Sequence, residues 1–324
     1  MERRTFLLAS GCALLGATDW IKTAIAAPAP APAPAQKATA IVSEQLLHTV
    51  VRIECPVPGG TIAGTGFFYG FFDDGKTENL CIVSNKHVLL GHSVCRIVFT
   101  AQGTDGQPDL TKLIPVTITD LAASVIPHPD QSVDLAIVNI SGIVNELQKR
   151  GTPVYFSYCN DGTIPDAATR ASLTPLEDIL TVGFPGTVWD TTHNLPIFHR
   201  GITATPINVD FQGRKEFLID SAVWAGASGS PVFLYEQGAL FDIRRNNTSF
   251  GWRLMLLGIV YANVLQDVSG DIHVQQIPTV PHVDSGVPSN LGICISSQRI
   301  LDFQPVLMAK GIKPPSDFKM RAMD

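Results

Sequence analysis

The sequence has no Cys-x-x-Cys pair, no run of basic residues and, after its N-terminal region, no apolar stretch long enough to cross a bilayer. Charged residues make up only 16% of the 324 residues, and the net charge is −6. A zinc site therefore has no support, and the chain lacks the basic stripe that binds nucleic acid. We expect no metal or other cofactor, no nucleic-acid partner and no stable membrane insertion of the mature chain.

Cysteine is also scarce, with six residues in the whole chain. Cys12 lies in the N-terminal apolar stretch, and its removal with that stretch leaves five, so at least one thiol must stay free. Cys81 and Cys95 are close enough in sequence to bridge. Buried free thiols are the interpretation we favour, and the disulfide pairing stays open.

The N-terminus has the features of an export signal. Arg3-Arg4 precedes a short apolar stretch, and Ala24-Ile25-Ala26 offers a small-x-small cleavage site. This pattern predicts a twin-arginine signal peptide over residues 1–27 and hence a periplasmic or secreted protein. A Sec signal, or a lipid anchor at Cys12, stays open as an alternative. The Pro- and Ala-rich residues 28–40 are expected to form a linker.

The remaining chain has the pattern of an all-β protein. Its 27 glycines and 23 prolines separate many short apolar runs, whereas helical patterns are few. The predicted strands are residues 50–55, 64–70, 80–84, 95–100, 114–119, 135–140, 179–183, 217–219, 232–235 and 254–260. A short helical or irregular link is expected near residues 143–150, a long loop or a hairpin over 264–290, and a C-terminal helix opening at 296–301.

Three segments carry residues that suit nucleophilic catalysis. Ser228 lies between two glycines in the segment 226–231, which allows a tight turn that exposes its hydroxyl. A serine between glycines is also common in ordinary loops. However, His87 follows one apolar strand and Asp134 opens another, and a nucleophilic serine needs such a base with an anionic partner.

These segments resemble the motifs of the chymotrypsin-like serine protease superfamily, above all its bacterial trypsin-like, HtrA-type branch. The resembling motifs surround His87, Asp134 and Ser228, in that order along the chain. Supporting matches are Gly64-Thr65-Gly66-Phe67, Gly183-Phe184-Pro185-Gly186 and Leu257-Gly258-Ile259-Val260. The resemblance covers roughly residues 45–305.

The resemblance implies an all-β fold of two Greek-key β-barrels with the active site between them. The first barrel is expected over residues 41–150 and the second over 151–305, followed by a short helix and a C-terminal tail over 306–324. Only about twenty residues follow Leu301, so we expect no peptide-binding PDZ domain of the HtrA kind.

The resemblance also assigns roles to residues. His87, Asp134 and Ser228 would form a catalytic triad, and the backbone N–H groups of Gly226 and Ser228 would form the oxyanion hole. Ala222 would lie at the base of the primary specificity pocket. The wall of that pocket would be formed by Tyr261, Ala262 and Asn263. The resemblance implies a serine endopeptidase that acts on protein or peptide substrates. Because Ala222 is uncharged, we expect cleavage after small or medium apolar residues.

The chain departs from the family pattern in three places. Ser230 replaces the usual second glycine, Asn85-Lys86 stands where small residues are usual, and Ala227 replaces an Asp or Asn. None of these changes removes a catalytic atom.

Two other functions remain open. An α/β-hydrolase esterase would need its histidine last, which would leave His87 and Asp134 unexplained. A catalytically silent protease-like binding protein would keep the fold without the activity. Asp130 is the nearest rival of Asp134, and Asp220 is interpreted as structural. Among the other histidines, His92 is close to His87 but lies beyond the end of the strand. Five more are interpreted as structural or exposed: His128, His193, His199, His273 and His282.

Overall fold

The structure is a computed structural model that describes residues 42–73, 79–186, 188–242, 247–268, 285–312 and 314–315. The predicted signal peptide and linker lie outside these residues. None of the helices within the described ranges is long and apolar enough to cross a membrane.

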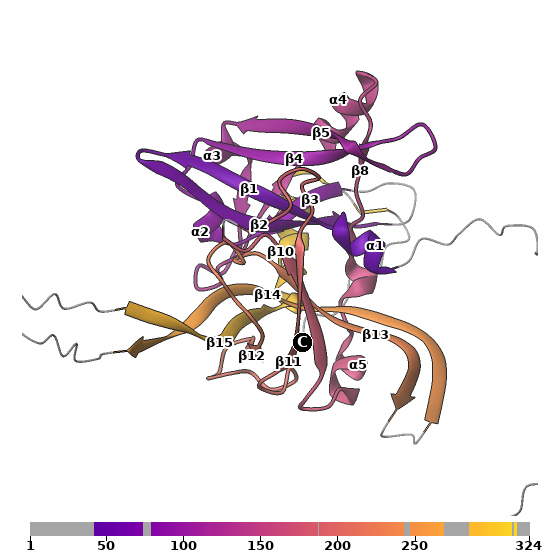
Figure 1. Ribbon diagram of the computed structural model, residues 1–324, viewed down its shortest axis with the longest axis vertical. Helices are drawn as coiled ribbons and strands as arrows, with labels where there is room; N and C mark the ends of the chain where they lie inside the picture. The colour runs from indigo at the N-terminus through magenta and orange to yellow at the C-terminus, as the bar shows by residue number, and fades with distance from the viewer. Residues whose placement is uncertain are drawn as a thin grey trace, which may run out of the picture. The chain divides into compact units, whose positions relative to one another are not determined.

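The first half of the chain forms a nine-stranded sheet, drawn from indigo to magenta in Figure 1. Seven strands follow the hydrogen-bonded order β5-β4-β1-β2-β3-β7-β6, while β8 pairs with β4 and β9 with β2. The strands are β1 (Val50–Val57), β2 (Gly60–Phe71), β3 (Asn79–Ser84), β4 (Val94–Gln102), β5 (Pro108–Thr119), β6 (Val125–Pro127), β7 (Ala136–Asn139), β8 (Val154–Tyr155) and β9 (Cys159–Asn160).

The second half forms a closed barrel in the order β10-β11-β12-β15-β14-β13. Its strands are β10 (Asp178–Gly183), β11 (Ile197–Thr203), β12 (Glu216–Asp220), β13 (Pro231–Asp242), β14 (Asn247–Val268) and β15 (Ser285–Ser296). Long hairpins formed by β13, β14 and β15 extend to both sides of the barrel (Figure 1). The expected all-β, two-barrel fold class is confirmed.

Helices are short and lie before, between or after the strands. They are α1 (Val42–Leu47), α2 (Lys86–Leu89), α3 (Leu121–Ser124), α4 (Ser141–Lys149), α5 (Ala167–Ser172) and α6 (Phe303–Ala309), with 3₁₀ turns η1 (Asp161–Thr163) and η2 (Ser297–Ile300). The expected link near residues 143–150 is α4. The expected C-terminal helix consists of η2 followed by α6, and its apolar residues Phe303 and Leu307 are fully buried.

The junction between the two halves falls later than residue 150. Strands β8 and β9 still pair with the first sheet, and the second barrel begins only with β10. The segment 264–290 contains the end of β14 and the start of β15, which pair as a hairpin.

Strands β3 and β7 are buried on both faces, which explains why their sequences are continuously apolar instead of alternating. On β3, Leu80 and Ile82 point into a core within the first sheet, whereas Cys81 and Val83 point into a second core. That second core also contains Phe233 of the second barrel and residues of α6, so it joins the two halves. The strand that precedes His87 and the strand that follows Asp134 are therefore fixed from both sides.

All five described cysteines are free and buried. Cys81 lies in the core shared by both halves, whereas Cys95 lies in the core of the first sheet. The two thiols thus face opposite sides of β3, and the alternative of a Cys81–Cys95 bridge is wrong. The side-chain partner of Cys95 is the thiol of Cys55 on the neighbouring strand β1.

Candidate active site

His87 is the second residue of α2, the single helical turn that follows β3. Its backbone N–H donates to Asp134 Oδ1 at 3.1 Å, and its ring Nδ1 lies 2.5 Å from Asp134 Oδ2. The side chains of His87 and Asp134 are 48% and 25% exposed. Because an ionised carboxylate can only accept, the hydrogen is on Nδ1, and Nε2 is left free to accept a proton.

The loop that carries Asp134 is held by the two residues that depart from the family's usual small residues. Asn85 Nδ2 donates to the backbone oxygen of Asp134 at 2.8 Å. Lys86 Nζ donates to the backbone oxygens of Asp130 and Gln131 at 3.0 and 3.2 Å. Burial lowers the pKa of Lys86, while the charges of Asp134 and Asp130 act in the opposite direction. The departures at residues 85–86 therefore tie α2 to the aspartate loop.

Ser228 occupies a tight loop that depends on glycine. Gly226 and Gly229 have φ values of +90° and +88°, a backbone conformation that residues with a side chain rarely adopt. The N–H groups of Ala227 and Gly229 are used within this region, donating to Trp224 O and Val260 O at 3.0 and 2.8 Å.

The N–H groups of Gly226 and Ser228 have no acceptor within the described part of the chain. They are the two donors that the sequence assigns to the oxyanion hole. The loop therefore keeps both donors available to a ligand oxygen.

Thr65 on β2 connects this loop to the first sheet. Its N–H donates to Ser228 O at 2.9 Å, and its hydroxyl donates to Gly226 O at 3.0 Å. The same hydroxyl accepts from the N–H of Phe184 at 3.0 Å. Sequence comparison identified the segment around Thr65 only as a supporting match, and no local pattern indicated its partners.

The serine loop also lies directly against the strand that leads to His87. A Cβ on Gly229 would overlap Thr65 O and would come within 2.5 Å of Ser84 Oγ. Ser84 ends β3, three residues before His87. The serine loop thus contacts the end of the strand that precedes His87, although no hydrogen bond between His87 and Ser228 occurs among the described residues.

The predicted pocket residues lie just after one strand of the second barrel and within another. Ala222 is half-buried just after β12, and Tyr261, Ala262 and Asn263 are half-buried on β14. The Tyr261 hydroxyl donates to Glu216 Oε2 at 3.0 Å. Burial, together with Glu216, raises the pKa of Tyr261 to about 12.

Glu216 was not identified from the sequence. Its side chain is only 9% exposed, and its carboxylate is paired with Arg214 at 3.1 Å in addition to Tyr261. This negative charge is therefore already satisfied by two partners. It offers no free carboxylate to a substrate cation.

Two other histidines have aspartate partners. His193 Nδ1 lies 2.7 Å from Asp190 Oδ2 at the surface, and buried His128 Nε2 lies 3.0 Å from Asp302 Oδ2. Unlike His87, which follows Ser84 by three residues, neither His128 nor His193 lies close in sequence to a residue that contacts the loop around Ser228. His199 is half-buried and His92 is partly exposed, whereas His273 and His282 lie outside the described residues.

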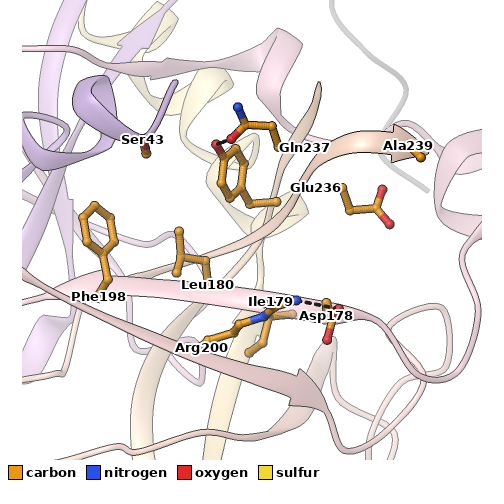
Figure 2. A pocket seen from close by; sticks show the side chains of 10 residues that line it. Ser43, Asp178, Ile179, Leu180, Phe198, Arg200, Glu236, Gln237 and Ala239 are labelled. Atoms are coloured by element: carbon orange, nitrogen blue, oxygen red, sulfur yellow. Dashed lines mark hydrogen bonds and ion pairs between the residues drawn. The ribbon is translucent and has the colours of Figure 1, made fainter. Parts of the chain in front are cut away.

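Within the described ranges, no three His, Cys, Asp or Glu side chains gather closely enough to hold a metal ion. A hollow of about 560 Å³ lies between strands of the second barrel and Ser43 of α1, and none of the predicted triad residues lines it. Figure 2 shows Phe198 and Leu180 on one side of this hollow and, below them, the ion pair between Arg200 and Asp178. Its lining includes no histidine or cysteine, so we assign it no catalytic role.

Comparison with known proteins gave one family and several distant structures. The Trypsin-like peptidase domain family matches residues 64–241, which is more than half of the chain. No curated protein matches the chain.

Among solved structures, the inactive form of the Rv3671c protease of M. tuberculosis H37Rv has 16% identity, with 83% of this chain and 91% of that chain covered and a TM-score of 0.40. The product complex of tobacco etch virus protease has 12% identity, covers 85% and 84% of the two chains and has a TM-score of 0.41. The apo MamO protease domain of Magnetospirillum magneticum has 14% identity, covers 80% and 97%, and has a TM-score of 0.37.

These structural likenesses are too distant to transfer any function. The family match does not depend on them, since it spans the segment around His87, Asp134 and Ser228 within residues 64–241. The chain belongs to the family of trypsin-like peptidase domains.

Proposed function

We propose that the protein is a serine endopeptidase in which Ser228, His87 and Asp134 form the catalytic triad. The observation that carries the proposal is the contact between His87 Nδ1 and Asp134 Oδ2 at 2.5 Å, beside a serine loop with two unused N–H donors. The distances fit a base whose tautomer is set by a carboxylate.

In this mechanism, His87 Nε2 takes the hydroxyl proton of Ser228 as the oxygen attacks the peptide carbonyl. The resulting oxyanion accepts hydrogen bonds from the N–H groups of Gly226 and Ser228. His87 then gives its proton to the leaving amine, and an acyl-enzyme remains. His87 Nε2 then takes a proton from a water molecule that attacks the ester carbonyl, and it returns this proton to Ser228 Oγ as the C–O bond breaks. The acid product leaves, and the hydroxyl of Ser228 is restored. Asp134 orients the ring and stabilises the imidazolium.

The proposed specificity is for small or medium apolar residues before the cleaved bond. Ala222 carries no charge, and the nearby carboxylate of Glu216 is occupied by Tyr261 and Arg214. A Lys or Arg side chain of a substrate would therefore find no free anionic partner in this region. Profiling with a peptide library tests this, and a dominant preference for Lys or Arg would refute it.

We further propose that the protein works outside the cytoplasm, after removal of residues 1–27. The support is the Arg3-Arg4 motif with its apolar stretch and its small-x-small site. Sequencing the N-terminus of the protein recovered from the producing cells tests this proposal, and an N-terminus at Met1 would refute it.

Labelling with a fluorophosphonate is the experiment that decides the catalytic proposal, because only an activated serine reacts. We expect one label per chain, located at Ser228 by peptide mapping and absent in Ser228→Ala. A folded wild-type protein that takes up no label would favour the protease-like binding protein instead.

A further inference from the structure

Two segments far from the triad in sequence meet at the loop that carries Asp134. This loop, residues 128–135, joins β6 to β7. On one side it receives Asn85 and Lys86 from the region of His87. On its other side it contacts the C-terminal segment formed by η2 and α6.

His128 is the buried centre of the second contact. Its side chain is 0% exposed, and its ring packs edge-on against Phe303 of α6 with 5.2 Å between the ring centroids. Nδ1 accepts from the N–H of Asp130 at 3.0 Å. Nε2 lies 3.0 Å from Asp302 Oδ2 and 3.1 Å from Arg299 O. The hydrogen is therefore on Nε2, and the ring bridges the aspartate loop to the C-terminal segment.

Arg299 supplies the second link. Its Nη2 donates to Asp130 Oδ2 at 2.8 Å, and the side chain is only 18% exposed. Its Nε lies 3.2 Å from Asp302 Oδ2, near enough for an ion pair although the angle does not make a hydrogen bond. The positive charge thus sits between two carboxylates, one in the aspartate loop and one in the C-terminal segment.

Asp130 transmits this link along the loop. Its Oδ1 accepts from the N–H and hydroxyl of Ser132 at 2.9 and 2.7 Å, and its backbone oxygen accepts from Val133 N at 3.2 Å and from Lys86. Hydrogen bonds from Ser132, and then the charge of Arg299, lower the pKa of Asp130. The carboxylate that Arg299 holds is therefore the one that shapes the turn into Asp134.

From these contacts we infer that Arg299, with His128, is a positioning residue that fixes Asp134 against His87. The inference rests on the proposed function. Asp130, which Arg299 binds, lies four positions before Asp134. The distance of 2.5 Å between His87 Nδ1 and Asp134 Oδ2 leaves little room for a displacement of the aspartate. Arg299 touches no reacting atom, so its effect is expected on the rate of the chemical step and not on substrate binding.

The test compares Arg299→Ala with Arg299→Lys and with the control Arg200→Ala. The control removes an arginine from an exposed ion pair with Asp178 on the second barrel, far along the chain from the aspartate loop. We expect Arg299→Ala to lower kcat about tenfold to a hundredfold with KM nearly unchanged, as for a misplacement of about 1 Å. Arg299→Lys should recover part of the rate because it restores one charge to Asp130, and Arg200→Ala should match the wild type.

A double-mutant cycle separates positioning from general loss of structure. If Arg299 acts through Asp134, adding Arg299→Ala to Asp134→Asn should cause little further loss, because the orientation is already lost. All variants are assayed well below their unfolding temperatures. Full additivity in the cycle, a rise in KM alone, or an unchanged Arg299→Ala would overturn the inference.

The fluorophosphonate reaction of the same proteins keeps the two proposals distinguishable. A reactive wild type with equally reactive Arg299→Ala overturns only the role of Arg299. A wild type that is folded but unreactive overturns the proposed function and this inference with it.

Discussion

The two halves of the candidate site are held in different ways. On the first sheet, His87 and Asp134 are fixed by side chains, since Asn85 and Lys86 bind the backbone of the aspartate loop. On the second barrel, the loop around Ser228 is fixed by backbone conformation, with glycines at φ near +90° and carbonyl oxygens bound by Thr65. A side-chain network can weaken in steps, whereas a loop pressed against a neighbouring backbone fails when one carbon is added.

The largest expected effect concerns Ser228 of the second barrel, whose hydroxyl is proposed to form the covalent bond to the substrate. Ser228→Ala should lower kcat by roughly 10⁶, because the proposed nucleophile is removed. Ser230→Ala is the matched control two residues away, since the buried Ser230 hydroxyl has no hydrogen-bond partner among the residues that the structure describes. Its removal should leave peptidase activity nearly unchanged. Loss of activity in Ser230→Ala with retention in Ser228→Ala would place the nucleophile elsewhere.

The second-largest expected effect concerns Asp134 on the first sheet, where side chains hold the site. Asp134→Asn should lower kcat by roughly 10⁴, because an amide can donate toward Nδ1 and favour the wrong tautomer of His87. Asp190→Asn serves as the control, since it alters a His–Asp contact of similar length at the surface, that of His193. Steady-state kinetics on a peptide substrate measure both. Equal losses in the two variants would show that the contact to His87 has no special role.

A smaller effect is expected from one added carbon in the backbone half. Gly229→Ala should cost about 10² to 10³ in kcat, comparable to the loss of an oxyanion donor. The new Cβ would overlap Thr65 O and push the serine loop away from the first sheet.

Gly238→Ala is the matched control for backbone strain alone. Gly238 also has a positive φ, +104°, but a Cβ there would meet no atom within 4 Å. Both variants should lose stability through the positive φ, yet only Gly229→Ala should lose activity. Similar kinetics for the two would show that contact with Thr65 does not hold the loop.

This difference between the halves also explains which features the sequence could predict. The strands were predictable because their apolar runs are local, and even the doubly buried β3 and β7 stand out as continuous runs. The predicted neighbours His87 and Asp134 are in contact, although the assignment of the whole triad stays a prediction.

The supporting contacts were not predictable because they join distant residues. Thr65 reaches Gly226 across 161 positions and Arg299 reaches Asp130 across 169, and neither leaves a local pattern. Asn85 and Lys86 appeared only as departures from the family, and their role is visible only through the carbonyl groups that they bind. Sequence motifs thus report the atoms proposed to react better than the atoms that hold them.

The smallest expected effect concerns stability and compares one histidine from each half. Burial lowers the pKa of His48, before β1, and of His199, on β11. Within the described ranges, the buried Nε2 of His199 has no hydrogen-bond partner. A lowered pKa in the folded state means that the unfolded chain takes up the proton more readily as the pH falls below about 6.5. The free energy of unfolding should therefore be steady at neutral pH and should decrease on acidification from pH 7.5 to 5.5. Urea unfolding should show a weaker pH dependence for His48→Gln and for His199→Gln than for the wild type. His92→Gln is the control, because it removes an imidazole from a partly exposed position. If His48→Gln alone reduces the pH dependence, protonation acts through the first sheet only, and the second barrel tolerates a charge on His199.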